Sequence, residues 1–172
     1  MLRRALASTL VLALVATSIG AASPALAPHL AAARRKSPPW LSIEAPVNPY
    51  DAATRDAVFL VRAMVREGTT RVDDLAGSAE GLVGGRRQSI ALRFDATPRP
   101  DVYAVRRQWP AGGTWVVRVT LLRNVTALVS LDRAGSVTGV RVPTQLSGGM
   151  PLPRAVAPGE IDSTLADAAA RR

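Results

Sequence analysis

The chain has 172 residues, of which 48% are hydrophobic and 20% are charged. This length fits one compact domain with extra terminal segments, and the patterned apolar runs oppose intrinsic disorder. The sequence has no cysteine, which excludes disulfide scaffolds, thiol catalysis, iron–sulfur clusters and zinc ribbons. Its 22 Lys and Arg residues against 13 Asp and Glu give a net charge of +9, and all but one of the basic residues are arginines. An anionic partner is therefore a hypothesis to weigh.

The first 27 residues have the three parts of a secretory signal peptide. Arg3 and Arg4 precede an uncharged, mostly apolar run over 5–19, and the small residues that follow end in Ala25-Leu26-Ala27. The apolar run is 15 residues long, which is shorter than the ~20 residues that a membrane-crossing helix needs. We therefore expect an exported protein, periplasmic or extracellular, with no transmembrane helix after signal cleavage.

Signal cleavage is expected after Ala27, with Ala22 and Ala33 as alternative sites because a proline follows Ala27 directly. The next segment, 28–49, is rich in Pro and Arg and is predicted to be a tether, since its prolines favour extended polyproline geometry. A short edge strand is expected within it at 41–45.

Residues 50–145 have the pattern of an antiparallel β-domain. Apolar and polar residues alternate in a series of short runs separated by turn signals, and this spacing predicts a two-layer sandwich or a barrel. The expected strands cover 56–66, 76–83, 89–94, 101–109, 114–121, 125–131 and 136–142. A helix is the alternative for 57–66, although its valines and phenylalanine favour a strand. The turn residues at 110–113 and 132–135 predict two hairpins, 101–121 and 125–142.

Residues 146–172 are predicted to form a Gly/Pro-rich loop and a C-terminal helix. Glycine and proline recur from Pro143 to Pro158, which predicts irregular structure over that stretch. Ile161 and Leu165 then recur at helical spacing, with acidic residues in the first turn and arginines at the end. We expect one helix from Gly159 to Ala170.

The segment 101–117 resembles a family pattern. Tyr103, then Trp109-Pro110, a glycine pair and Trp115 with alternating aliphatic residues resemble the signature of bacterial immunoglobulin-like envelope modules. These include the YtkA-like and FixH-like domains and, more loosely, the copper-resistance CopC fold. The resemblance covers about 56–142 and implies an all-β, immunoglobulin-like antiparallel β-sandwich of about seven strands, with Tyr103 and Trp115 in the core. It also implies an exported accessory domain, often near copper trafficking or cytochrome oxidase assembly.

Copper binding is one alternative function, and His29 is its candidate ligand as the single histidine of the chain. Cleavage after Ala27 would put His29 second in the mature chain, whereas an amino-terminal copper site needs histidine third. The chain also lacks the histidine- and methionine-rich clusters of the copper-handling members, because only Met64 and Met150 remain after cleavage. We expect no bound metal and no cofactor, and the copper-binding accessory role stays an alternative hypothesis.

Enzymatic activity is not expected. A serine nucleophile needs a base, and the one histidine lies in the predicted tether. The paired carboxylates that a glycosidase would use exist as Asp73 with Asp74 and as Asp95 with Asp101. They stand in turns and loops, where carboxylates commonly bond the backbone.

The arginines of the predicted strands are the remaining candidates for function. Arg106, Arg107 and Arg118 fall on outward positions or turns and are possible contacts for a polyanion or a protein partner. Nucleic acid is not expected, since aromatic residues do not interleave with the arginines. The predicted function is an exported, non-enzymatic binding or assembly module of the cell envelope. Its expected partner is another envelope protein or, alternatively, an anionic glycan or lipid surface.

Overall fold

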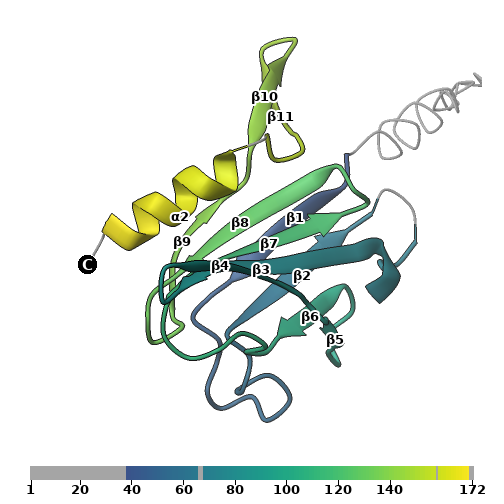
Figure 1. Cartoon of the computed structure of the whole chain (residues 1–172). Coiled ribbons are helices and arrows are strands. Elements are labelled where there is room, and N and C mark those ends of the chain that lie inside the picture. The colour runs from purple at the N-terminus through teal and green to yellow at the C-terminus, as the bar shows by residue number, and fades with distance from the viewer. Residues whose placement is uncertain (1–37, 66–67, 158, 171–172) are drawn as a thin grey trace, which may run out of the picture. The chain divides into compact units, whose positions relative to one another are not determined.

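A computed structural model describes residues 38–65, 68–157 and 159–170. The predicted signal peptide, the first part of the predicted tether and His29 lie outside these residues. The described chain consists mainly of antiparallel strands with one α-helix, as predicted for an all-β chain (Figure 1). The elements are β1 (Trp40–Glu44), β2 (Phe59–Met64), the 3-10 turn η1 (Val72–Asp74), β3 (Leu75–Val83), β4 (Arg86–Ala91), β5 (Asp95–Ala96), β6 (Val102–Val105), β7 (Thr114–Leu121), β8 (Val125–Leu131), β9 (Val137–Arg141), β10 (Thr144–Ser147), β11 (Met150–Pro153) and α2 (Glu160–Ala170).

The first sheet has four strands in the order β1-β2-β6-β5. All of its neighbouring strands are antiparallel, and Val61 at its centre lies between Ile43 of β1 and Tyr103 of β6. The alternation in β2 directs Phe59, Val61 and Ala63 inward, and each of these side chains is fully buried. The predictions of a strand in this part of the chain and of a short edge strand near 41–45 are confirmed.

The second sheet has five strands in the order β4-β3-β7-β8-β9. Its central strand β7 pairs with β3 on one side and with β8 on the other, so its inward residues lie in the middle of the molecule. The predicted hairpin of β8 and β9 is confirmed. At its turn the N–H of Gly135 donates to the carbonyl of Asp132 at 3.0 Å, and the N–H of Ser136 donates to the Asp132 carboxylate at 2.8 Å.

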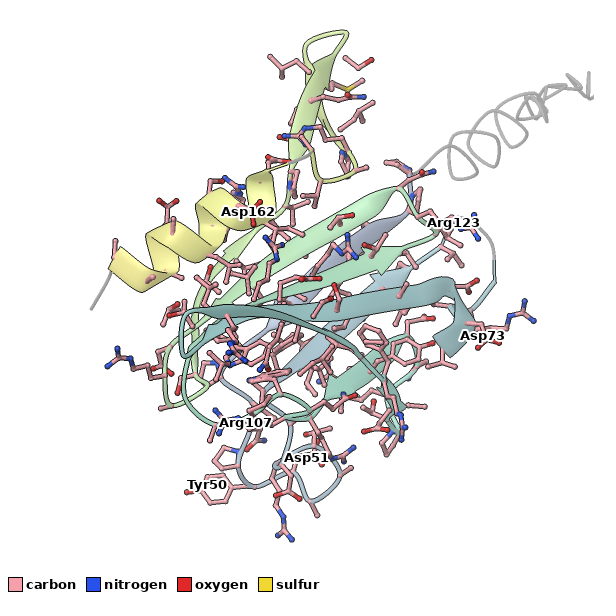
Figure 2. The ribbon with its side chains drawn as sticks, viewed as in Figure 1. Tyr50, Asp51, Asp73, Arg107, Arg123 and Asp162 are labelled. Carbon is pink, nitrogen blue, oxygen red and sulfur yellow. The ribbon has the colours of Figure 1, made fainter. Side chains whose placement is uncertain are left out.

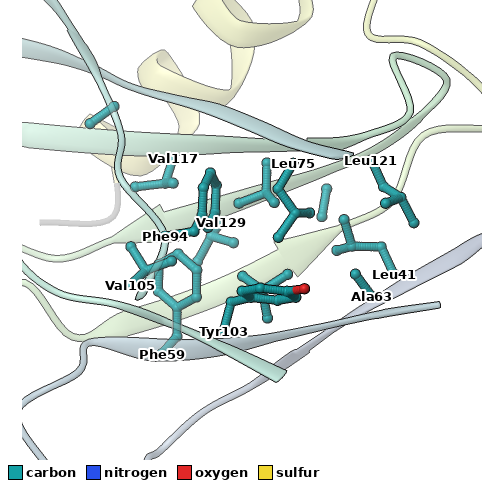
Figure 3. Close-up of a cluster of buried hydrophobic side chains, with 14 of the residues drawn as sticks. Leu41, Phe59, Ala63, Leu75, Phe94, Tyr103, Val105, Val117, Leu121 and Val129 are labelled. Atoms are coloured by element: carbon teal, nitrogen blue, oxygen red, sulfur yellow. The ribbon is translucent and has the colours of Figure 1, made fainter. Parts of the chain in front are cut away.

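One apolar core lies between the two sheets (Figure 3). Both sheets contribute alternate side chains to it, and most of these are less than 5% exposed. Burial of this many aliphatic and aromatic side chains is the main stabilising term, at about 1.5–3 kcal/mol for each large one. The buried members are Leu41, Phe59, Val61, Ala63, Leu75, Ala79, Phe94, Tyr103, Val105, Trp109, Trp115, Val117, Val119, Leu121, Val125, Ala127, Val129 and Leu131.

The predicted hairpin over 101–121 is wrong. β6 belongs to the first sheet and β7 to the second, so the chain crosses between the sheets over 106–113. The expected burial of Tyr103 and Trp115 is confirmed, because both side chains lie in the core. Trp109 fills the crossing, with its ring centroid 6.5 Å from that of Trp115. Two inward-alternating runs joined by a short loop have the same pattern whether they pair with each other or face each other across a core.

A buried hydrogen-bond network fixes the end of the first sheet beside the loop that follows β2. The hydroxyl of Tyr103 donates to the carbonyl of Thr70 at 2.5 Å, and the Thr70 hydroxyl donates to the carbonyl of Ala63 at 2.8 Å. The Asp101 carboxylate accepts the N–H of Thr70 at 2.8 Å. Burial raises the pKa of the Tyr103 phenol. The network gives hydrogen-bond partners to buried polar groups, which would lower the stability of the fold if they were left unpaired.

The helix α2 confirms the predicted C-terminal helix, and it packs on the outer face of the second sheet (Figure 1). Leu165 is only 2% exposed and forms a small buried cluster with Val116 of β7 and Leu128 of β8. Ile161 and Val156 lie at the margin of this cluster. The alternation of β7 therefore places Val116 on its outer face, where the helix buries it.

Ion pairs hold α2 at its first turn. Two guanidinium nitrogens of Arg154 donate to the Glu160 carboxylate at 2.7 and 2.8 Å, and the N–H of Ala157 donates to it at 2.5 Å. Arg141 of β9 lies 3.6 Å from the same carboxylate. The hydrogen bonds from Arg154 and Ala157 lower the pKa of Glu160 to about 2. Arg87 of β4 forms a further ion pair with Asp162 on the helix.

The irregular structure predicted for Pro143–Pro158 is contradicted by a further hairpin. Strands β10 and β11 pair there, and Gly148 and Gly149 at the turn both have the positive φ that two-residue hairpin turns require. The hairpin projects away from the two sheets (Figure 1). The glycine and proline content that predicted a loop is located at the turn and in β11, where a short edge strand tolerates it.

Candidate functional site

Four connections gather at one end of the two-sheet body, and we call this the loop end. They are the β1–β2 loop (45–58), the β3–β4 turn (84–85), the crossing 106–113 and the β8–β9 turn (132–136). Two shallow pockets show that these connections are neighbours. One of about 360 Å³ lies between the first and the last connection, and one of about 540 Å³ lies among the other turns and reaches the end of α2.

Arg106 stands at the loop end and is already paired. Its guanidinium forms an ion pair with Asp95 and donates to the carbonyl of Ala53 at 3.3 Å. Arg106 thereby ties the β1–β2 loop to the short strand β5. Because its charge is offset by a carboxylate, Arg106 offers less to an external anion than the sequence suggested.

Arg107 is oriented differently. Its side chain is exposed, and one guanidinium nitrogen donates to the carbonyl of Ala134 in the β8–β9 turn at 3.1 Å. Among the residues that the structure describes, no carboxylate lies within ion-pair distance of it. Arg107 is thus a cation held in position by a backbone group, which lowers the conformational entropy that binding would cost. Figure 2 shows Arg107 at the same end as Tyr50 and Asp51.

Arg118 lies apart from these two residues. It is in the middle of β7, on the outer face of the second sheet, and its neighbour across the strand pair is Ser78 of β3. The side chain is partly buried there, whereas Arg107 is exposed at the loop end. The outward orientation predicted for Arg118 is confirmed, but the three candidate arginines do not form one contact face.

A third pocket adjoins the loop end and contains a residue that the sequence did not single out. It has a volume of about 480 Å³ and is lined by Ile90, Ala91, Arg93, Asp95, Arg106 and Gln108. Gln108 accepts the N–H of Arg93 at 2.8 Å and donates to the carbonyl of Arg93 at 2.9 Å. This amide joins the crossing to the segment after β4 as a strand neighbour would. No sequence pattern marks a glutamine for such a role.

Further exposed arginines surround the loop end. Arg55, Arg86 and Arg133 are exposed, and the described part of the chain places no carboxylate within ion-pair distance of them. Two of the acidic residues there bond within their own loops: Asp51 accepts from Thr54 and Ala53, and Asp132 accepts within its own turn. A third, Asp56, is exposed and forms no ion pair within the described residues. The loop end therefore presents guanidinium groups more than carboxylates.

The charge of the described residues is nevertheless close to balance. They contain 14 arginines and 12 Asp and Glu, and 14 minus 12 leaves +2 of the +9 that the whole chain carries. The remaining excess belongs to residues outside the described ranges. A broad polyanion-binding face over the two sheets is therefore poorly supported by their charge.

Three of the four carboxylates named as possible catalytic pairs have structural partners, and the fourth, Asp73, is exposed. Asp95 pairs with Arg106, Asp101 accepts the N–H of Thr70, and Asp74 accepts the N–H of Arg71 at 2.8 Å. Within the described ranges, no three His, Cys, Asp or Glu side chains are placed to hold a metal ion together. His29 lies outside those ranges, so the copper hypothesis stays as the sequence left it.

No helix in the described part of the chain combines the length and the apolar character that a bilayer span requires. Comparisons with protein-family models, with curated proteins and with solved structures found no match to this chain.

Proposed function

We propose that this chain is an exported, non-enzymatic binding or assembly module of the cell envelope, and that it contacts a partner protein through the loop end. The observation that carries the proposal is Arg107, an exposed guanidinium fixed against the carbonyl of Ala134 without a carboxylate partner in the described structure. Guanidinium groups in fixed positions bind carboxylates with well-defined geometry. An acidic segment of another envelope protein is the partner that this chemistry fits.

The fold that we propose for this module is immunoglobulin-like. In that fold, strands A, B, E and D form one sheet, and strands C′, C, F and G form the other in variable-type domains. The orders β1-β2-β6-β5 and β4-β3-β7-β8 match this arrangement strand for strand in chain order, with β9 added beside β8. The crossing 106–113 then corresponds to the connection between strands E and F. This correspondence supports the resemblance to exported immunoglobulin-like modules.

The exposed arginines of the loop end suit binding because none of them belongs to the core cluster. In a two-sheet fold the connections tolerate variation, while the inward faces of the strands supply stability. Arg107 and Arg133 belong to the connections, and the buried cluster contains no residue from the two turns at 84–85 and 132–136. A change at either arginine should therefore affect binding more than stability.

Site-directed crosslinking in the native host tests the proposal. A photo-crosslinking residue at Arg133 should capture a reproducible envelope protein, and one at the exposed Asp73, in the η1 turn rather than the loop end, should not. Arg107→Ala should reduce capture at position 133 by about tenfold, as expected for loss of one charge-assisted contact. Arg62→Ala, an exposed arginine on β2, is the matched control and should leave capture unchanged.

Three results would decide against the loop end. Equal capture from positions 133 and 73 would indicate no specific face, and capture insensitive to Arg107→Ala would remove Arg107 from the contact. Recovery of anionic glycan or lipid in place of protein would support the polyanion alternative. Binding to an acidic protein and binding to an anionic glycan or lipid should both weaken with salt. The identity of the captured molecule therefore distinguishes the two hypotheses.

A further inference from the structure

The two edges of the β10–β11 hairpin differ in their backbone chemistry. Pro151 is paired with Leu146, and Pro153 is paired with Thr144. Proline has no N–H, so these cannot be the pairs that exchange hydrogen bonds within an antiparallel ladder. The N–H of Arg154 donates to the carbonyl of Pro143 at 3.0 Å, which agrees with this alternation. The residue pairs whose backbone groups hydrogen-bond across the hairpin are therefore 143/154, 145/152 and 147/150.

It follows that each strand directs different groups to the outside. The outer edge of β10 carries the N–H and C=O groups of Thr144 and Leu146, whereas that of β11 carries only the carbonyls of Pro151 and Pro153. Within the described chain, the N–H groups of Thr144 and Leu146 donate to no backbone group outside the hairpin. Natural proteins close open edges with prolines, charges or bulges. The prolines of β11 prevent a further strand from pairing with its outer edge, but β10 has no proline, charged residue or bulge that would do so.

The exposed β10 edge is uncharged on a basic protein. The segment 142–153 contains no charged residue, while the whole chain carries +9. The side chains of β10 are all exposed, and Leu146 is 79% exposed. Two copies of the chain therefore meet no like charges from this segment when they approach at the hairpin. The hairpin projects from the two sheets (Figure 1).

The geometry points to a second copy of this chain as the occupant of the β10 edge. With the strands antiparallel about a two-fold axis at Gln145, Thr144 of one copy exchanges backbone hydrogen bonds with Leu146 of the other. The result is a continuous sheet in the order β11-β10-β10-β11. Pro151 and Pro153 then lie on both outer edges, so the assembly stops at two copies. The contact is small, which predicts a weak dimer that depends on concentration.

Sedimentation equilibrium and amide hydrogen exchange of the protein purified from its own host test this pairing. Dimer should form as concentration rises, and the amide protons of Thr144 and Leu146 should gain protection in parallel. Those of Gln145 and Ser147, which bond within the hairpin, should be protected throughout. Leu146→Pro removes an outward donor but none of the hairpin's own bonds, and should weaken dimerisation by about tenfold or more. Leu146→Ala keeps the donor and should weaken it less.

A gain of assembly provides the second arm. Pro151→Val with Pro153→Val restores N–H donors on the β11 edge, and this variant should form species larger than dimers, whereas the parent chain should stop at dimers. A chain that stays monomeric at every concentration overturns the proposal, as does dimerisation unaffected by Leu146→Pro. Protection of the Leu146 amide that appears only when a different envelope protein is added would assign the edge to that protein instead. None of these outcomes depends on Arg107 or the loop end.

Discussion

The two faces of the five-stranded sheet are covered in different ways. The inner face of β7 carries Trp115, Val117 and Val119, which pack against the first sheet without any charged neighbour in the core cluster. The outer face has an apolar patch of Val116 and Leu128, which α2 covers with Leu165 and with ion pairs at its rim. The packing on the inner face is therefore stabilised by the fit of apolar side chains alone. The packing of α2 on the outer face is stabilised by apolar burial and by ion pairs.

This difference separates two kinds of stability in one small domain. Close packing on the inner face leaves no space for an added atom, so steric changes there should be costly. The outer face is covered by α2, a helix of 11 residues, and an element packed at the surface in this way can open locally before the whole domain unfolds. We expect changes on the inner face to act on global unfolding, and changes under α2 to act first on local opening.

The largest effect should come from Gly81→Ala on the inner face. A Cβ atom at Gly81 would overlap the ring of Trp115, and that ring is held by a hydrogen bond from its indole nitrogen to the carbonyl of Gly112 at 2.9 Å. We expect a loss of about 3 kcal/mol or more in the free energy of unfolding, measured by urea denaturation.

Gly139→Ala is the matched control for this substitution. Gly139 is also in a strand of the same sheet, but nothing lies within 4 Å of the place where its Cβ would be. Its effect should stay within about 0.5 kcal/mol, because only the backbone entropy changes. A comparable loss at both positions would show that the packing around Trp115 is not what makes Gly81 necessary.

The next largest effect should come from Leu165→Ala in α2. This change removes most of the buried contact with Val116 and Leu128, at a cost of about 2 kcal/mol. Amide exchange of the helix should accelerate, while exchange of β7 amides stays slow because the core is intact. Leu146→Ala, at a leucine that is 79% exposed, should leave exchange in α2 unchanged. Equal acceleration in β7 would mean that helix and core unfold as one unit.

The inner face was predictable from the sequence, and its pairing was not. Tyr103 and Trp115 were expected in the core and are buried there, and the alternation of their runs is a local property of a strand. Whether two such runs share a sheet is decided by contacts distant in sequence. The crossing at 106–113 was for that reason predicted as a hairpin.

The candidate site was predictable only in part. The expected strand 101–109 includes Arg106 and Arg107, whereas β6 ends at Val105 and both arginines lie in the crossing. Their different bonding, to Asp95 and to Ala134, depends on segments that lie far apart along the chain. The β10–β11 hairpin was missed because glycine and proline indicate a turn and leave its short flanking strands without an apolar alternation to read. The role of Gln108 could not be predicted, because no sequence pattern indicates its hydrogen bonds to Arg93.

The smallest effect should come from Glu160→Gln at the rim of α2. The pKa of Glu160 is lowered from 4.5 to about 2 by its bonds to Arg154 and Ala157, so folding favours its charged form. Its contribution to stability is therefore complete above pH 4.5 and is lost as the pH falls through 2. The Gln variant should be less stable than the parent at neutral pH, by less than Leu165→Ala, because the pair is partly exposed to solvent.

The same comparison at low pH isolates the ionic part of the outer face. The difference between parent and Glu160→Gln, followed by urea denaturation, should shrink between pH 4.5 and 2 and vanish near the lower limit. Asp167→Asn is the control, since Asp167 is exposed on the same helix and forms no ion pair within the described residues. A difference that stays constant with pH would show that the glutamate acts through packing, and the outer face would then depend on shape as the inner face does.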